Sequence, residues 1–187
     1  IMNLGIIQGR LSQPSNGFQE CPVKWKEEFF LLEQLDLNHI EWIVTDKFLD
    51  NPLFGNDVSS YNISSICADF FVSDLFFDKT TLESYLIKTC KISIKNNIEY
   101  ITIPLLEKSN VHQEIDRLQF IEFIGKIAKS FPSFKFSFET ELQPSELLNI
   151  VSGSDNFFIT YDTGNITSCM FSHEKCIEFF KNKINNV

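Results

Sequence analysis

The stretches FSFETEL (136–142) and FFITYDTGN (157–165) decide the fold of this chain. Each is a short apolar, aromatic-rich run that ends in carboxylate, at Glu139 and Glu141 in the first and at Asp162 in the second. Near-continuous apolar runs are typical of buried parallel strands, and α/β enzymes place their chemistry just beyond the carboxyl ends of such strands. Two adjacent strands of this kind predict a divalent-metal or acid–base site on their shared rim.

The same carboxylates also allow a structural interpretation, in which they cap the helices that follow the two strands. Glu139 and Glu141 are two residues apart, so both side chains could face the same side of the sheet. Both interpretations stay open at this point.

The composition predicts one globular domain over residues 1–187, because nothing in the sequence resembles a linker. The net charge of −9 makes nucleic acid a poor partner, since an acidic protein repels phosphate backbones. No apolar run approaches membrane-spanning length and no signal peptide precedes the first strand, so we expect no membrane partner.

The five cysteines include no C-x-x-C pair and are odd in number, which favours a reducing cytoplasm over a disulfide framework. Cys169, His173 and Cys176 fall close together and allow a zinc site. Spacing along one helix face explains this cluster equally well.

Short apolar runs alternate with longer amphipathic runs, the pattern of βα units around a parallel sheet. The predicted strands are 4–8, 39–44, 63–71, 100–106, 134–141 and 157–162, and the predicted helices are 25–35, 81–96, 116–129, a short one from 144, and 172–182. A complete (β/α)8 barrel takes ~250 residues. We therefore expect an α/β fold of the TIM-barrel type, truncated to about six βα units, with another strand due at 183–187.

Polar residues at the predicted strand ends line one rim. They are Gln8, Arg10, Glu41, Asp69, Glu107, Glu139, Glu141, Asp162 and Asn165. Gly9 permits a tight turn after the first strand, and Arg10 suits either phosphate or carboxylate binding or a salt bridge to a rim acid. Glu41 is expected to face inward at the rim, or else to be a buried acid paired with Arg10.

Five stretches of the chain, GIIQGRLSQ, HIEWIV, ISSICADFF, FSFETEL and YDTGN, together resemble the xylose isomerase-like TIM-barrel superfamily, in its sugar phosphate isomerase/epimerase branch. The resemblance covers essentially the whole chain. The order of the two acid-ended strands followed by Asp-Thr-Gly is its most specific part.

The resemblance implies a divalent metal (Mn, Mg, Co or Zn) held by a Glu of the fifth strand, an Asp of the sixth, a His of the seventh and a Glu of the eighth. Glu139 and Asp162 match the first two ligands, and the other two have no counterpart in residues 1–187. Asn165 stands where the family often has His, and its amide can still hydrogen-bond a sugar hydroxyl.

The implied reaction is proton transfer next to the carbonyl of a small sugar or sugar phosphate, through an enediolate. Glu139 would be both catalytic residue and metal ligand. The residues expected to bind substrate are Gln8, Arg10, Glu41, Asp69, Glu107, Glu141 and Asn165. As the isolated 187-residue chain we expect weak metal binding and little or no turnover, and open strand edges favour a homodimer or a covering segment.

Two other functions remain open. An AP endonuclease-like phosphodiesterase shares the superfamily fold, but its zinc site needs histidines where this chain has Asp69, Pro104 with Glu107, and Asn165. A non-catalytic or truncated barrel relic would lack a complete site, and metal affinity separates it from an enzyme.

Overall fold

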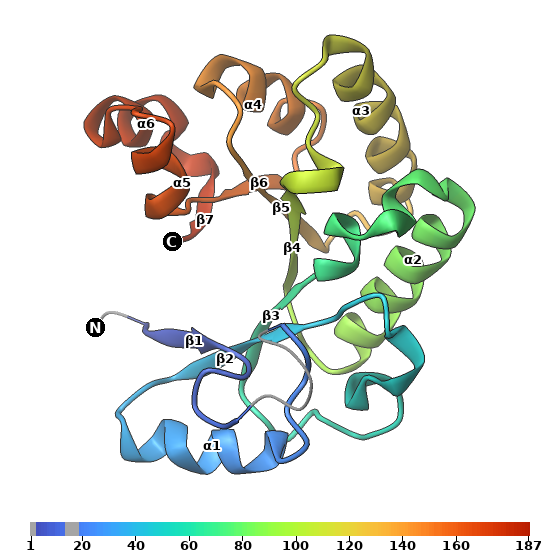
Figure 1. Cartoon of the computed structure of the whole chain (residues 1–187), viewed down its shortest axis with the longest axis vertical. Helices are drawn as coiled ribbons and strands as arrows, with labels where there is room; N and C mark the ends of the chain where they lie inside the picture. Colours follow the sequence, from blue (N-terminus) through green and yellow to red (C-terminus); the bar gives the residue numbers. More distant parts are fainter. Residues whose placement is uncertain (1–2, 14–18) are drawn as a thin grey trace.

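The computed structural model describes residues 3–13 and 19–187. In this part of the chain seven strands form one parallel sheet, in the order in which they follow one another along the sequence. The strands are β1 (Gly5–Ile7), β2 (His39–Ile43), β3 (Ile63–Cys67), β4 (Tyr100–Leu105), β5 (Lys135–Thr140), β6 (Phe157–Thr160) and β7 (Ile184–Asn186). The sheet curves into an arc with helices outside it and with both chain ends at its open side (Figure 1).

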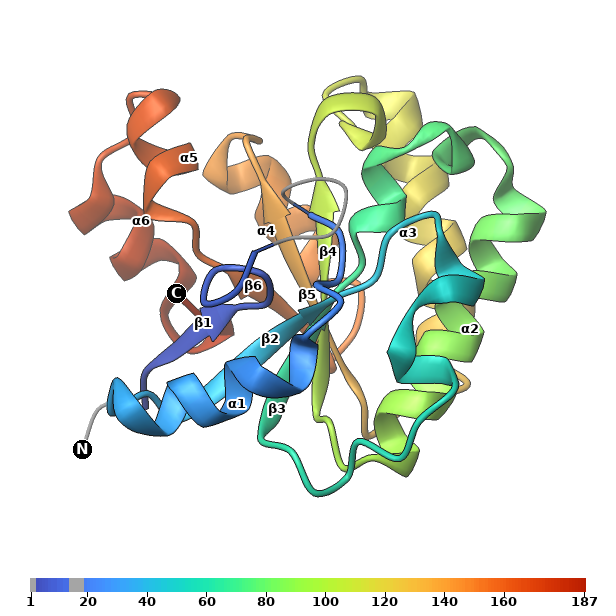
Figure 2. The same ribbon diagram turned by 60° about the horizontal axis from the view of Figure 1, so that its bottom comes forward.

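Helices follow the strands and cover the convex face of the sheet. They are α1 (Trp25–Gln34), α2 (Lys79–Lys95), α3 (Glu114–Ala128), α4 (Pro144–Val151), α5 (Thr163–Ser168) and α6 (His173–Phe180). Figure 2 shows β4 and β5 running in the same direction, with α3 outside them. The α/β class and the TIM-barrel type of curvature predicted from the sequence are therefore confirmed. In the part of the chain that the structure describes, no helix is both long enough and apolar enough to cross a bilayer.

Strand β5 shows how the sequence separates the two faces of the sheet. Phe136 and Phe138 are buried on the convex face, where the ring of Phe138 meets that of Phe120 in α3 edge-on at 5.7 Å between centroids. Ser137 and Glu139 alternate with them and point to the concave face. The core therefore lies between the sheet and the helices. Burial of each aromatic ring there stabilises the fold by about 1.5–3 kcal/mol.

The six predicted strands are observed, and residues 184–186 form a seventh, within the range 183–187 where another strand was expected. Ile184 pairs with Ile159 and Asn186 pairs with Thr160 of β6. An apolar run does not mark this strand, since two of its three residues are asparagines. Their side chains turn to the polar concave face, where apolar residues are not required.

Two boundaries also differ from the sequence prediction. The third strand ends at Cys67 rather than at Phe71, and Asp69–Val72 form a turn of 3₁₀-helix instead. A short helix, α5, follows the sixth strand and was not predicted. Its sequence TGNITS is poor in helix formers, and the helix depends on the cap that Asp162 provides at its start.

Candidate functional site

The two predicted metal ligands lie beside the same residue at the carboxyl ends of β5 and β6. The side-chain amide of Asn165 donates a hydrogen bond of 3.1 Å to Glu139 Oε1. The backbone N–H of Asn165 donates to Asp162 Oδ1 at 2.6 Å. Asn165 therefore holds both carboxylates on one rim, as the sequence predicts for neighbouring strand ends.

The capping interpretation applies to Asp162, whose Oδ1 satisfies the N-terminal N–H group of α5. Glu139 instead accepts a hydrogen bond from a side chain of that helix and stays half-buried. Burial raises the pKa of Glu139 to about 7, and the neighbouring carboxylate of Asp162 adds to the effect. A carboxyl group with this pKa can exchange a proton near neutral pH.

Asp69 and Glu107 share a second part of the rim. Asp69 begins the 3₁₀ turn after β3, and Glu107 begins another after β4 with a φ of 47°. Burial raises the pKa of Asp69 to about 6, with further contributions from Glu107, Asp46 and Glu20. The carboxylates on this part of the rim therefore repel one another.

The raised pKa of Asp69 predicts a pH-dependent change in stability. A carboxyl group whose pKa is higher in the folded state takes up a proton on folding between its unfolded value of ~3.9 and its folded value of about 6. Its stabilising contribution is present below the unfolded pKa and is lost as the pH rises toward the folded one. Asp69→Asn should therefore be more stable than wild type in urea at about pH 8, and this advantage should shrink toward about pH 4. An advantage that grows on acidification contradicts the assignment.

The loop after β1 places Gln8 and Arg10 at the same rim. Gln8 is buried and its side-chain oxygen accepts from the N–H of Ile43 at 3.2 Å, which ties the loop to β2. Gly9 has a φ of 81°, so the predicted tight turn is confirmed and needs glycine. The guanidinium of Arg10 donates to the carbonyl of Gln8 at 3.4 Å and to Gln19 Oε1 at 2.9 Å.

A residue that sequence reasoning missed, Glu28 of α1, holds this loop in place. Its buried carboxylate accepts hydrogen bonds from the backbone N–H groups of Gly9, Leu11 and Ser12, at 3.0–3.1 Å. The buried face of α1 consists of Trp25, Glu28 and Leu32. A carboxylate on an otherwise apolar helix stripe is the sequence signal that could have found it.

Glu41 faces the concave side of the sheet, as expected, but below the rim. Its Oε2 atom accepts hydrogen bonds from Ser65, Thr102 and Asn186. Burial raises the pKa of Glu41. The residue is half-buried, with hydroxyl and amide groups around its carboxyl group, and its expected role in substrate binding stays a prediction.

The remaining predicted residues are Glu141 and the cluster considered for zinc. Glu141 lies one residue past β5 and is exposed, and no described contact joins its carboxylate to the Glu139 rim. The zinc alternative at Cys169, His173 and Cys176 gains no support, because both ring nitrogens of His173 face hydroxyl groups, those of Tyr161 at 3.0 Å and Thr167 at 3.1 Å.

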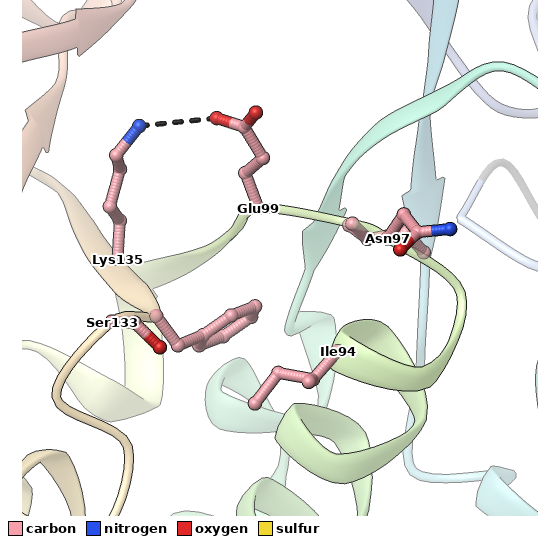
Figure 3. Close-up of a pocket in the computed structure, with 7 residues that line it drawn as sticks. Ile94, Asn97, Glu99, Ser133 and Lys135 are labelled. Atoms are coloured by element: carbon pink, nitrogen blue, oxygen red, sulfur yellow. Dashed lines mark hydrogen bonds and ion pairs between the residues drawn. The ribbon is translucent and has the colours of Figure 1, made fainter.

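A cavity at the opposite end of the sheet does not belong to this rim. It has a volume of about 350 Å³ and is lined by Ile94, Asn97, Ile98, Glu99, Ser133, Phe134 and Lys135. Figure 3 shows the ion pair between Lys135 and Glu99 beside it, with an N–O distance of 3.2 Å. These residues either precede β4 or lie just before and at the start of β5, so the cavity lies at the amino ends of the strands, where TIM-type barrels carry stability rather than chemistry.

Carboxylate oxygens are the donors that hard divalent cations prefer, so Glu139 and Asp162 suit such an ion in kind. These two carboxylates alone are a small set of ligands. Over residues 3–13 and 19–187, no three His, Cys, Asp or Glu side chains are grouped so that they could hold a metal ion.

No protein-family model matches this sequence, and a comparison with characterised proteins finds no match either. Solved structures do match. D-psicose 3-epimerase with D-tagatose from Clostridium cellulolyticum H10 superimposes with a TM-score of 0.74 at 13% identity, over 98% of this chain and 71% of that one. The chain has a TIM-barrel-type fold.

Two further solved structures support this assignment. L-ribulose 3-epimerase matches with a TM-score of 0.72 at 14% identity, over 98% of this chain and 68% of that one. A xylose isomerase-like TIM-barrel protein from Mycobacterium smegmatis in complex with magnesium matches at 0.69 and 11% identity, over 95% and 71%. At these identities the likeness concerns the fold, and the chain spans about seven-tenths of each of these structures.

Proposed function

We propose that this chain carries part of the active site of a metal-dependent sugar or sugar-phosphate isomerase or epimerase. The observation that carries the proposal is the meeting of Glu139 and Asp162 at Asn165, on the rim where β5 and β6 end. The matching structures named as epimerases, and one in complex with magnesium, support the same class of reaction and the same kind of ion.

In this proposal Glu139 and Asp162 would hold the cation, which would supply polarisation of the sugar carbonyl and so favour loss of the neighbouring proton. Glu139 takes up that proton at its carboxylate. Asn165 orients the carboxylate by its hydrogen bond to Oε1. The β1–α1 loop offers Arg10 to an anionic group of the substrate, with Gln8 fixing the loop.

A non-catalytic barrel is the second candidate, and the small number of grouped ligands among the described residues favours it. The two candidates differ in metal binding. An enzyme site retains some affinity for Mn²⁺ through its two carboxylates, whereas a relic has no reason to keep them together.

The test combines Mn²⁺ titration, followed by electron paramagnetic resonance, with exchange of the carbonyl-adjacent sugar proton into D₂O. We expect weak, saturable Mn²⁺ binding to the 187-residue chain, with little exchange. In a protein that contains this chain within a complete eight-stranded barrel, we expect exchange that depends on the metal. Absence of Mn²⁺ binding favours the relic, and exchange that persists without metal contradicts the proposed role of the cation.

A further inference from the structure

The loop between β1 and α1 folds around a side chain of the helix that follows it. The backbone N–H groups of Gly9, Leu11 and Ser12 all donate to Oε1 of Glu28, at 3.0–3.1 Å, and the N–H of Gly9 also reaches Oε2 at 3.0 Å. Glu28 has an exposed fraction of 0%. Three donors from one short loop therefore converge on one buried carboxylate.

The backbone conformation of the loop makes this convergence possible. Gly9 has a φ of 81°, which is the left-handed region that favours glycine. Successive N–H groups in a turn of this kind point into one concavity, and such concavities bind anions. The loop therefore has the form of an anion-binding site whose anion belongs to the protein itself.

The surroundings of Glu28 leave the loop as its main partner. A buried carboxylate is normally paired with a basic side chain or fully hydrogen-bonded. None of the ion pairs among residues 3–13 and 19–187 includes Glu28. Its neighbours on the buried face of α1 are Trp25 and Leu32. The three N–H groups therefore supply most of the polar contacts of this carboxylate, and they would lose their acceptor without it.

We propose that residues 9–12 form a backbone anion site, that the carboxylate of Glu28 is its built-in ligand, and that occupation of this site places Arg10 at the rim. The N–H groups on either side of Arg10 are bound to Glu28, so its backbone is fixed from both directions. Its guanidinium interacts electrostatically with Glu28 and with Cys67 and Asp69 at the end of β3.

Glu28 is in this view a positioning residue, which acts on Arg10 through the loop. The significance of Arg10 for substrate rests on the proposed function, in which it meets an anionic group. The anion site itself does not rest on that function, because its evidence is the contacts of Glu28 alone.

Replacement of Glu28 with Ala, followed by addition of acetate, tests the site. Acetate has the same atoms as the part of the side chain that this substitution removes. We expect Glu28→Ala to raise the equilibrium constant of unfolding by roughly 10–100-fold, because buried donors lose their acceptor. Acetate should then reverse much of this loss as its concentration rises, since it binds only the folded state. Acetamide, which has the same shape without the charge, should not.

The matched control is Leu32→Ala, on the same buried face of α1. This substitution also leaves a cavity, but nothing there corresponds to the three N–H groups of the loop. Urea unfolding at constant ionic strength, with chloride replacing acetate, measures each case. The proposal is overturned if acetate fails to stabilise Glu28→Ala, if acetamide does so equally well, or if acetate stabilises Leu32→Ala to the same extent.

The position of Arg10 can be followed separately by NMR. The chain has two arginines, and the second, Arg117, pairs with Glu146 at 3.0 Å and serves as an internal reference. We expect the side-chain Nε–H signal of Arg10 to shift in Glu28→Ala and to return with acetate, while that of Arg117 stays in place. An unchanged Arg10 signal contradicts the positioning role. Neither metal nor sugar is needed, so this failure is distinct from failure of the proposed function.

Two further measurements keep the test decisive if Glu28→Ala does not fold. Glu28→Gln keeps one oxygen for the three N–H groups but places an NH₂ group near the N–H of Gly9, so the Gly9 amide signal should shift. In wild type, the amide protons of Gly9, Leu11 and Ser12 should exchange slowly with D₂O although they lie outside every helix and strand. Exchange at the rate of free amides, or an unperturbed Gly9 signal in Glu28→Gln, contradicts the anion site.

Discussion

Replacing Glu139 with Gln is expected to abolish Mn²⁺ binding to this chain. The substitution keeps the shape of the side chain and its contact with Asn165, but removes one of two anionic oxygen donors and the proton acceptor. In a protein that contains this chain within a complete barrel, exchange of the carbonyl-adjacent sugar proton should fall by about 10²–10⁴-fold. Electron paramagnetic resonance of Mn²⁺ and proton NMR in D₂O measure the two effects.

The matched controls separate loss of chemistry from loss of fold. Asp162→Asn should also weaken Mn²⁺ binding, while its side-chain oxygen can still cap α5. Glu122→Gln, on the exposed face of α3, should change neither quantity. Full exchange activity in Glu139→Gln would show that another residue removes the proton.

Phe138→Ala should lower the free energy of unfolding by about 3–5 kcal/mol, since it removes a buried ring and leaves a cavity. The ring of Phe138 lies between sheet and helices, with its centroid 5.7 Å from that of Phe120 and 5.1 Å from that of Phe157. Urea unfolding followed by circular dichroism measures the loss. A change below about 1 kcal/mol would mean that the ring contributes little to the stability of the core.

Phe77→Ala provides the comparison for this core substitution. Phe77 keeps 70% of its side chain exposed, so its truncation removes little buried area. Its effect should stay within about 0.5 kcal/mol.

Much of the fold follows from the sequence because strands and helices in this chain differ in apolar period. Strands β2, β4 and β5 begin within one residue of their predicted starts, since buried parallel strands are apolar over their whole length. The helix predicted at 25–35 is likewise observed at Trp25–Gln34. In both cases burial against the core dictates the pattern.

The features that no apolar run marks in the sequence are those in which polar contacts replace apolar ones. Strand β7 has only Ile184 as an apolar residue and joins the sheet through pairing with β6 and the hydrogen bond of Asn185 to Ser137. Helix α5 starts because Asp162 caps it, although its residues have a low propensity for helix. Such partners are distant in sequence, so local pattern does not reveal them.

For the candidate site, the sequence placed Glu139, Asp162 and Asn165 on one rim, and the structure brings them together. The sequence did not predict how far below the rim each residue lies. Glu41 and Glu139 are both strand carboxylates, yet Glu41 accepts hydrogen bonds from Ser65 and Thr102 below the rim, whereas Glu139 meets Asn165 at the rim. The register between neighbouring strands sets that difference, and the sequence of a single strand does not reveal it.

The hydrogen bond from Asn186 to Glu41 joins residues 145 positions apart, whereas each strand pairs only with its neighbour along the chain. Bringing such distant segments together costs more loop entropy than adding the next strand. Folding of this domain should therefore proceed as growth of the sheet from strand to strand, with the β2–β7 contact formed after the transition state. Substitutions at Asn186 would then speed unfolding while leaving the folding rate almost unchanged.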